Sequence, residues 1–464
     1  MHRSCNENQS IKEPRNEYSS SSSAFGSAAG HRKQTNISPE VAKILVEQVK
    51  YRLALQHDLC IQMKQHAINP SSSLPPPLPT SRANYTNDGR NEKRIIRAVN
   101  VPVAEKPPNF KNLKPTLQIL KDLEQLHLHT HQLLHDITST VILERFSVPD
   151  RFLVASTIEQ IQARHANTIE NLVEINLLLR NNSNNESTTD DNYYTWMERK
   201  FLDQFLYERS RIILLCDHYI ALDRHIPNPS QNNNYSRKGV VHLNCPIYDV
   251  LQDAILEASH LCDANLGTAP DIVILDEDEV QKINNISLIR SWVHYSLVEL
   301  LKNAMASSVE RYQLTPESSN HPSIIYIKVV QQQQKSTIVE CQIIDQGVGI
   351  QSSDSLEKAW RFASSGIEER WCRLKEQRSY AMVRSPLQSL GVGLTLSRMM
   401  MRMFGGDIEL FSRSENTTIT DIKKGADGTI LSSQEIHLDS GCTAKIRING
   451  NITHKDGDKI PNLK

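Results

Sequence analysis

Apolar side chains recur every three or four residues along four long segments of the N-terminal half, which is the spacing of amphipathic helices. The segments are 39–66, 115–140, 154–179 and 196–222. Polar connectors separate them, so the pattern predicts a helical bundle over residues 38–225. His127, His131 and His135 fall on one face of the second segment, where we expect a partly exposed polar stripe, with a metal site as the alternative.

The pattern changes after residue 239. Residues 248–262 and 288–311 keep helical spacing, whereas shorter runs, mostly rich in Ile and Val, predict strands. These runs are 271–275, 324–330, 339–345, 407–412 and 444–449. Helices that alternate with strands, several of them antiparallel, predict an α+β fold in which the helical bundle precedes an α/β sandwich.

Composition narrows the function classes. Lys and Arg number 52 against 53 Asp and Glu, so the chain has no basic excess for nucleic acid. Its eight cysteines are scattered without a C-x-x-C pair, which disfavours structural zinc and a disulfide framework. No apolar run approaches the roughly 20 residues of a membrane span. Residues 1–37 are Ser-rich with several basic residues but also Glu7, Glu13 and Glu17, so a disordered segment and a transit peptide both remain open.

The first motif that could take part in a reaction is Glu299-Leu-Leu-Lys-Asn303, inside the predicted helix 288–311. Residues four apart share a helix face, so this carboxylate and this amide lie about one turn apart. Such a pair can hold Mg²⁺ or orient a nucleophile beside a metal, although alone it also fits a solvated helix face.

Two glycine motifs follow. Asp345-Gln-Gly347-Val-Gly349 ends a predicted strand, where glycines permit close backbone approach to a ligand and the Asp can accept a hydrogen bond from a purine amino group. Leu390-Gly391-Val392-Gly393-Leu394 opens an apolar helix, whose first amides favour phosphate. The second motif fits neither a Walker pattern, because no Gly-Lys-Ser/Thr follows, nor a Rossmann pattern, because no clear strand precedes it.

The order of these motifs, closed by Gly441-Cys-Thr443 before the last strand, resembles the Bergerat (GHKL) ATP-binding superfamily. Further strings resemble the mitochondrial 2-oxoacid dehydrogenase kinases, which act on pyruvate or branched-chain 2-oxoacid dehydrogenase. They are Glu299-Leu-Leu-Lys-Asn-Ala-Met305, Phe201-Leu-Asp-Gln-Phe205 with Arg209, and Arg164-His165. Tyr295, four residues before Glu299, slightly favours the branched-chain member over the pyruvate members.

The resemblance implies a serine protein kinase with ATP and Mg²⁺ as cofactors and K⁺ as a possible third. Glu299 would be the general base and Asn303 the Mg²⁺ ligand, with Asp345 on the adenine amino group. The nucleotide would lie against Gly347, Gly349, Gly391, Val392, Gly393, Leu394 and Thr443. Residues 349–390 would form the ATP lid.

The implied domains are a segment 1–37, a lipoyl-docking bundle 38–225, a linker 226–239, an ATP-binding kinase domain 240–450 and a tail 451–464. The implied partners are the dehydrogenase α subunit, the lipoyl domain of the acyltransferase core and a second copy of the chain, in the mitochondrial matrix. No nucleic acid partner is expected.

The chain departs from the family pattern at three positions. Ala306 replaces an Arg, Ser389 replaces the first Gly of the second glycine box, and Val348 replaces a frequent Gly. Two alternatives therefore stay open: an ATP-binding pseudokinase or docking protein, and a two-component-type histidine kinase with His135 as a distant candidate for the phosphorylated residue.

Overall fold

The computed structural model describes residues 39–68, 114–140, 148–183, 201–224, 237–284, 286–315, 321–331, 337–350, 352–363, 391–413, 417–424 and 430–451. In these residues a set of helices precedes a mixed sheet with helices, so the predicted α+β class is confirmed. The expected segment 1–37 and most of the expected linker and tail lie outside the described residues.

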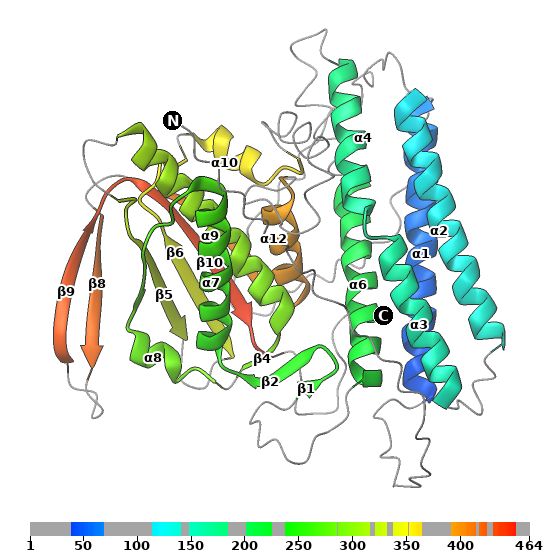
Figure 1. Ribbon diagram of the computed structural model, residues 1–464, viewed down its shortest axis with the longest axis horizontal. Coiled ribbons are helices and arrows are strands. Elements are labelled where there is room, and N and C mark those ends of the chain that lie inside the picture. Colours follow the sequence, from blue (N-terminus) through cyan, green and yellow to red (C-terminus); the bar gives the residue numbers. More distant parts are fainter. Residues whose placement is uncertain are drawn as a thin grey trace, which may run out of the picture. The chain divides into compact units, whose positions relative to one another are not determined.

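Five helices of the described residues form the bundle, and their axes run side by side in Figure 1. They are α1 (Pro39–Ile68), α2 (Lys114–Thr140), α3 (Val148–Arg164), α4 (Thr168–Ser183) and α6 (Asp203–Arg224). Their apolar faces meet in two clusters: Leu53, Leu134, Ile158 and Tyr219 lie in one, and Leu120, Leu172 and Phe205 in the other. Each of these side chains is at most 1% exposed, so burial of the predicted apolar stripes stabilises the bundle.

Two predictions in the bundle were wrong. The segment 154–179 is two helices, with a turn at 165–167 in which Thr168 N donates to His165 O at 3.2 Å. Apolar positions on both sides of the turn concealed the break. His127 is not part of an exposed stripe but is fully buried, and its ring packs edge-on against His165 and Phe205.

The sheet that carries the second half has five strands in the order β3-β5-β6-β10-β7. They are β3 (Ile272–Leu275), β5 (Ile325–Gln331), β6 (Ile338–Ile344), β10 (Gly441–Asn449) and β7 (Asp407–Arg413). Only the β3–β5 pair is parallel. All five predicted strands are therefore present in one sheet, and the residues 441–443 lie inside β10 and not before it.

Helices cover one face of this sheet in Figure 1. α7 (Ile247–Leu266) packs along α9 (Arg290–Leu314), and α12 (Gly393–Met403) packs on α9 and β7. Buried side chains of α7, α9 and the strands form one core, to which Leu251, Leu301, Ile327, Ile343 and Ile446 belong. This packing fixes α9, the helix with Glu299 and Asn303, against the sheet.

Several short elements were not predicted. β1 (Arg237–Lys238), β2 (Val241–Cys245) and β4 (Ile286–Ile289) form a small antiparallel sheet, and α8 (Glu277–Gln281) and α10 (Ser353–Ala359) are single short helices. The strand β8 (Thr417–Lys424) pairs with β9 (Ile430–Leu438), although the stretch is rich in polar residues. Thr and Ile favour extended backbone through their branched Cβ atoms, and this signal outweighs their polarity here.

None of the described helices is both long enough and apolar enough to cross a membrane.

Candidate functional site

One face of α9 carries polar side chains at four-residue intervals: Glu299, Asn303, Ser307 and Arg311. Because residues four apart share a helix face, these four side chains form a continuous polar stripe on an otherwise largely buried helix. Asn303, in the middle, is exposed.

Glu299 is 9% exposed and accepts a hydrogen bond from Lys302 Nζ at 2.7 Å through Oε1. Its other oxygen, Oε2, faces the start of α12. A Cβ atom added to Gly393 would lie 2.0 Å from this oxygen, so a side chain there would have to displace the carboxylate. The structure therefore brings the predicted base and the second glycine motif into direct contact.

The first glycine motif meets the same helix one turn beyond Asn303. Val348 N donates to Ser307 Oγ at 3.1 Å, and a Cβ atom on Gly347 would lie 2.1 Å from that oxygen. Gly349 has φ of 69°, which glycine adopts without steric cost. Both glycine motifs thus border the α9 stripe, with Asn303 between the two contacts in sequence.

Asp345 follows β6 and is 4% exposed. Its Oδ1 accepts hydrogen bonds from Gly347 N at 3.0 Å and from Cys442 N at 3.1 Å. Burial raises the pKa of this carboxyl to about 6, against the opposing effect of these hydrogen bonds and of Arg413. A buried carboxyl of this kind is suited to accept a hydrogen bond from a donor group of a ligand.

The second glycine motif forms a helix start without a side-chain cap. Gly391 has φ of 68°, and Val392 is the residue before the first helical turn of α12. Leu396 N already bonds to Val392 O, whereas the amides of the first turn have no partner within the helix. Leu394 packs against the core behind them. Free amides and the positive end of the helix dipole at this position attract phosphate.

Thr443 lies on β10 beside the end of β6, where Asp345 N donates to Cys442 O at 3.0 Å. Its hydroxyl accepts a hydrogen bond from Arg413 Nη1 at 3.2 Å. Arg413 Nη2 also donates to the main-chain oxygens of Asp345 and Asp439. One guanidinium therefore ties together the two residues predicted for the adenine end.

The expected lid is described only at its start. α10 leads to Trp360, over which Arg398 stacks at 4.3 Å, and to Phe362, which is buried among side chains of the bundle. Asn176 Nδ2 of α4 donates to Phe362 O at 3.3 Å. Residues 364–390, including Ser389, lie outside the described residues.

Sequence reasoning missed Ser307, Arg311 and Arg413. The four-residue spacing from Asn303 could have found the first two, and Arg311 Nη1 indeed donates to Gln346 O at 3.1 Å and Ser440 O at 3.0 Å. Arg413 has no local signal, because its partners Asp345, Asp439 and Thr443 are distant in the sequence. Ala306, where the family has Arg, is 7% exposed and belongs to the apolar core.

The donor set fits a magnesium nucleotide. An amide oxygen and a carboxylate are ligands that Mg²⁺ accepts, and the glycine-lined backbone leaves room for phosphates. Among the described residues, no cluster of three or more His, Cys, Asp or Glu could hold a metal alone. A magnesium ion here would therefore need the phosphates of a nucleotide as further ligands.

Known proteins resemble this chain in sequence. A pyruvate dehydrogenase kinase of Schizosaccharomyces pombe is 29% identical over 214 residues, which are 46% of this chain and 46% of that protein. Human pyruvate dehydrogenase kinase isozyme 4 is 30% identical over 217 residues, or 46% of this chain and 48% of that protein. The chain thus spans about half the length of these curated relatives. Among solved structures, a mycobacterial sensor histidine kinase aligns with 44% of this chain and 94% of its own at 12% identity and a TM-score of 0.25.

A family model also matches the N-terminal half of the chain, where sequence motifs are sparse. The model described as mitochondrial branched-chain alpha-ketoacid dehydrogenase kinase matches residues 3–242, which are 240 of the 464 residues. The chain belongs to this family of mitochondrial 2-oxoacid dehydrogenase kinases.

Proposed function

We propose that this protein is an ATP-dependent serine kinase that phosphorylates, and thereby inactivates, the dehydrogenase α subunit of a mitochondrial 2-oxoacid dehydrogenase complex. One observation carries the proposal: the polar stripe of α9 touches both glycine motifs, with Glu299 at Gly393 and Ser307 at Val348. Along α9 the exposed Asn303 therefore lies between two contacts with glycine-rich backbone, which is the kind of backbone that a nucleoside triphosphate binds.

Each predicted residue has a role in this proposal. Asn303 holds Mg²⁺, and Asp345 and Thr443 receive the adenine. Gly347, Gly349, Gly391, Val392, Gly393 and Leu394 border the ribose and phosphates. Bound Mg²⁺ neutralises charge on the phosphates, and the protein supplies position and electrostatics.

Glu299 is the proposed general base. Lys302 holds Oε1, which leaves Oε2 on the side of Gly393 to accept the proton of the substrate serine. The ion pair also fixes the carboxylate in a single orientation, which general-base catalysis needs.

The partners and location belong to the same proposal and follow from family membership. The helical bundle docks the lipoyl domain of the acyltransferase core, two copies of the chain form a dimer, and the protein acts in the mitochondrial matrix, with K⁺ as a possible further cofactor. The family model names the branched-chain complex and the curated relatives name the pyruvate complex, so the substrate complex must be found by experiment.

The test is transfer of radiolabelled phosphate from ATP to purified pyruvate and branched-chain dehydrogenase complexes. The wild type should label the α subunit of at least one complex, and Glu299→Gln should lower the rate about 10²-fold or more. Glu310→Gln is the matched control, since Glu310 is an exposed carboxylate on the same helix. Its rate should equal that of the wild type.

The outcomes separate the candidate functions. Labelling of one complex only names the substrate. MgATP binding without labelling of either complex would favour an ATP-binding pseudokinase, and label on a histidine of the chain itself would favour a histidine kinase.

A further inference from the structure

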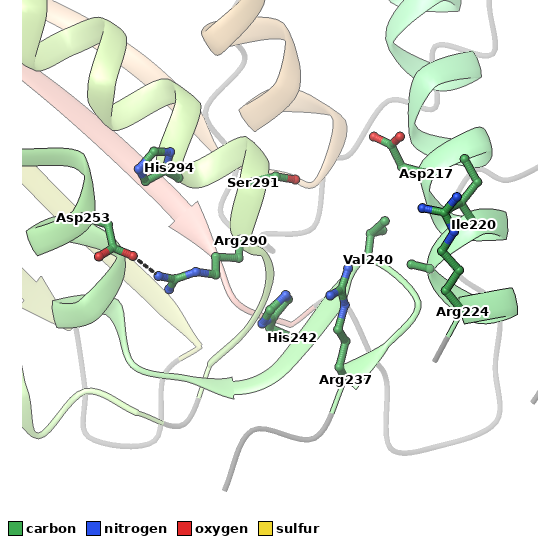
Figure 2. A pocket seen from close by; sticks show the side chains of 11 residues that line it. Asp217, Ile220, Arg224, Arg237, Val240, His242, Asp253, Arg290, Ser291 and His294 are labelled. Atoms are coloured by element: carbon green, nitrogen blue, oxygen red, sulfur yellow. Dashed lines mark hydrogen bonds and ion pairs between the residues drawn. The ribbon is translucent and has the colours of Figure 1, made fainter. Parts of the chain in front are cut away.

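A cavity lies outside the proposed nucleotide site, between α6 of the bundle, the β1–β2 turn and the first turn of α9 (Figure 2). Its volume is about 750 Å³, which is the size of pockets for small molecules. None of the residues assigned above to the nucleotide lines it. Its walls carry charged and imidazole side chains together with an apolar patch of Ile220, Ala221 and Val240.

Three arginines from three different elements line the cavity: Arg224 from the last turn of α6, Arg237 from β1 and Arg290 from the start of α9. Figure 2 shows Arg224 and Arg237 extending into the space between α6 and the β1–β2 turn. Arg224 pairs with Glu159 and Arg290 with Asp253. Within the described part of the chain, Arg237 has no carboxylate at ion-pair distance, and its Nε donates to Gly239 O at 2.6 Å.

Two acidic residues also line the cavity, and each has a hydrogen-bond partner. Asp253 is engaged by Arg290. Asp217 accepts a hydrogen bond from Gln162 at 2.7 Å, and burial raises the pKa of its carboxyl. Among the lining residues the three arginines outnumber the two carboxylates.

Two further groups favour an anion. Burial, together with Arg237 and Arg290, lowers the pKa of His242 to about 4, so this ring is a neutral hydrogen-bonding group in a positive environment. α9 begins at Arg290 without a side-chain cap, so the first amides of this 25-residue helix, at Arg290 and Ser291, are not used within the helix. The helix dipole adds partial positive charge at the same wall.

From the cavity, its three arginines and the uncapped start of α9, we propose that this space binds a small organic anion with two or more acidic oxygens, either a di- or tricarboxylate or an organic phosphate. Guanidinium groups recognise both through paired N–H donors. The bound anion contacts α6 and the first turn of the helix that carries Glu299. The proposal is independent of the kinase assignment.

The test is isothermal titration of the full-length protein with citrate and, separately, with glycerol phosphate, without Mg²⁺ and at constant ionic strength. The wild type should bind one equivalent of at least one of them, and the two titrations distinguish carboxylate from phosphate. Arg237→Gln should weaken binding about tenfold or more, because it removes a charge-assisted contact, and Arg237→Lys should weaken it less. Arg402→Gln, which neutralises an arginine of α12 outside the cavity, should bind as the wild type does.

Arg224→Gln supplies a second variant at a largely exposed side chain, whose replacement should not perturb folding. It should also weaken binding. Saturable binding that survives both Arg237→Gln and Arg224→Gln would place the anion elsewhere, such as at the glycine motifs. That result, or no saturable binding of either anion to the wild type, would overturn the proposal.

Discussion

Lys302 Nζ lies 2.7 Å from Glu299 Oε1 on the same helix, and the two side chains are 2% and 11% exposed. A buried carboxylate that loses its only cation costs far more than the pair itself contributes. We therefore expect Lys302→Met to lower the free energy of unfolding by about 3 kcal/mol. The double variant Glu299→Gln/Lys302→Met should recover part of that loss. Urea denaturation of the wild type, the two single variants and the double variant measures the coupling energy between the two side chains. Equal losses in Lys302→Met and in Lys282→Met, which breaks an exposed pair, would contradict this expectation.

Gly393 has no room for a methyl group, because the added Cβ would lie 2.0 Å from Glu299 Oε2. Gly393→Ala must displace this carboxylate, and we expect phosphate transfer to fall about tenfold or more for a mispositioned base. Gly267→Ala is the matched control: it has φ of 76° and nothing within 4 Å, so its strain should lower stability and leave the transfer rate unchanged. The measurements are the phosphate-transfer rate and the melting temperature of both variants. An unimpaired transfer rate in Gly393→Ala would argue against Glu299 as the base.

Arg413 joins Thr443 Oγ1 to the backbone oxygens of Asp345 and Asp439. Its removal leaves these acceptors without a shared donor, so the walls of the adenine end should loosen. We expect Arg413→Gln to raise the dissociation constant of MgATP about tenfold, measured by calorimetry, with Arg413→Lys between the two. Arg402→Gln neutralises an arginine that pairs with Asp407 instead, and its affinity should stay at the wild-type value.

Periodicity was sufficient for the helix 288–311 and the five strands of the sheet, which were predicted within a few residues. Along β5, β6 and β10 alternate side chains are buried, and the apolar side chains of the helix lie in the core. Periodicity failed where tertiary contacts decide the local structure. At the turn 165–167, His165 makes a buried hydrogen bond of 3.0 Å with Thr130 of α2. No pattern within the segment 154–179 reveals this contact.

The candidate site shows the same division. Short sequence motifs contain Glu299, Asn303, Asp345 and the glycines, so the resemblance of these motifs to those of a known family is visible in the sequence. Arg413 acts across three strands, and its register opposite Gly441 exists only in the folded sheet. The cavity with Arg224, Arg237 and Arg290 likewise combines residues from three separate elements, which no single local motif contains.

Asp345 gives the proposed adenine contact a pH dependence. Burial raises its pKa to about 6, above the ordinary value near 4, so between these values the folded protein holds a proton that a free carboxyl has released. The charged form is the better acceptor for an amino group, and MgATP affinity should therefore fall as the pH drops through about 6. The nucleotide phosphates titrate in a similar range, so the informative quantity is the difference between wild type and Asp345→Asn at each pH. Asn keeps an acceptor oxygen but has no titration, and its affinity should follow the phosphates alone. Parallel curves for the two proteins between pH 5 and 7.5 would show that Asp345 does not titrate in contact with the nucleotide.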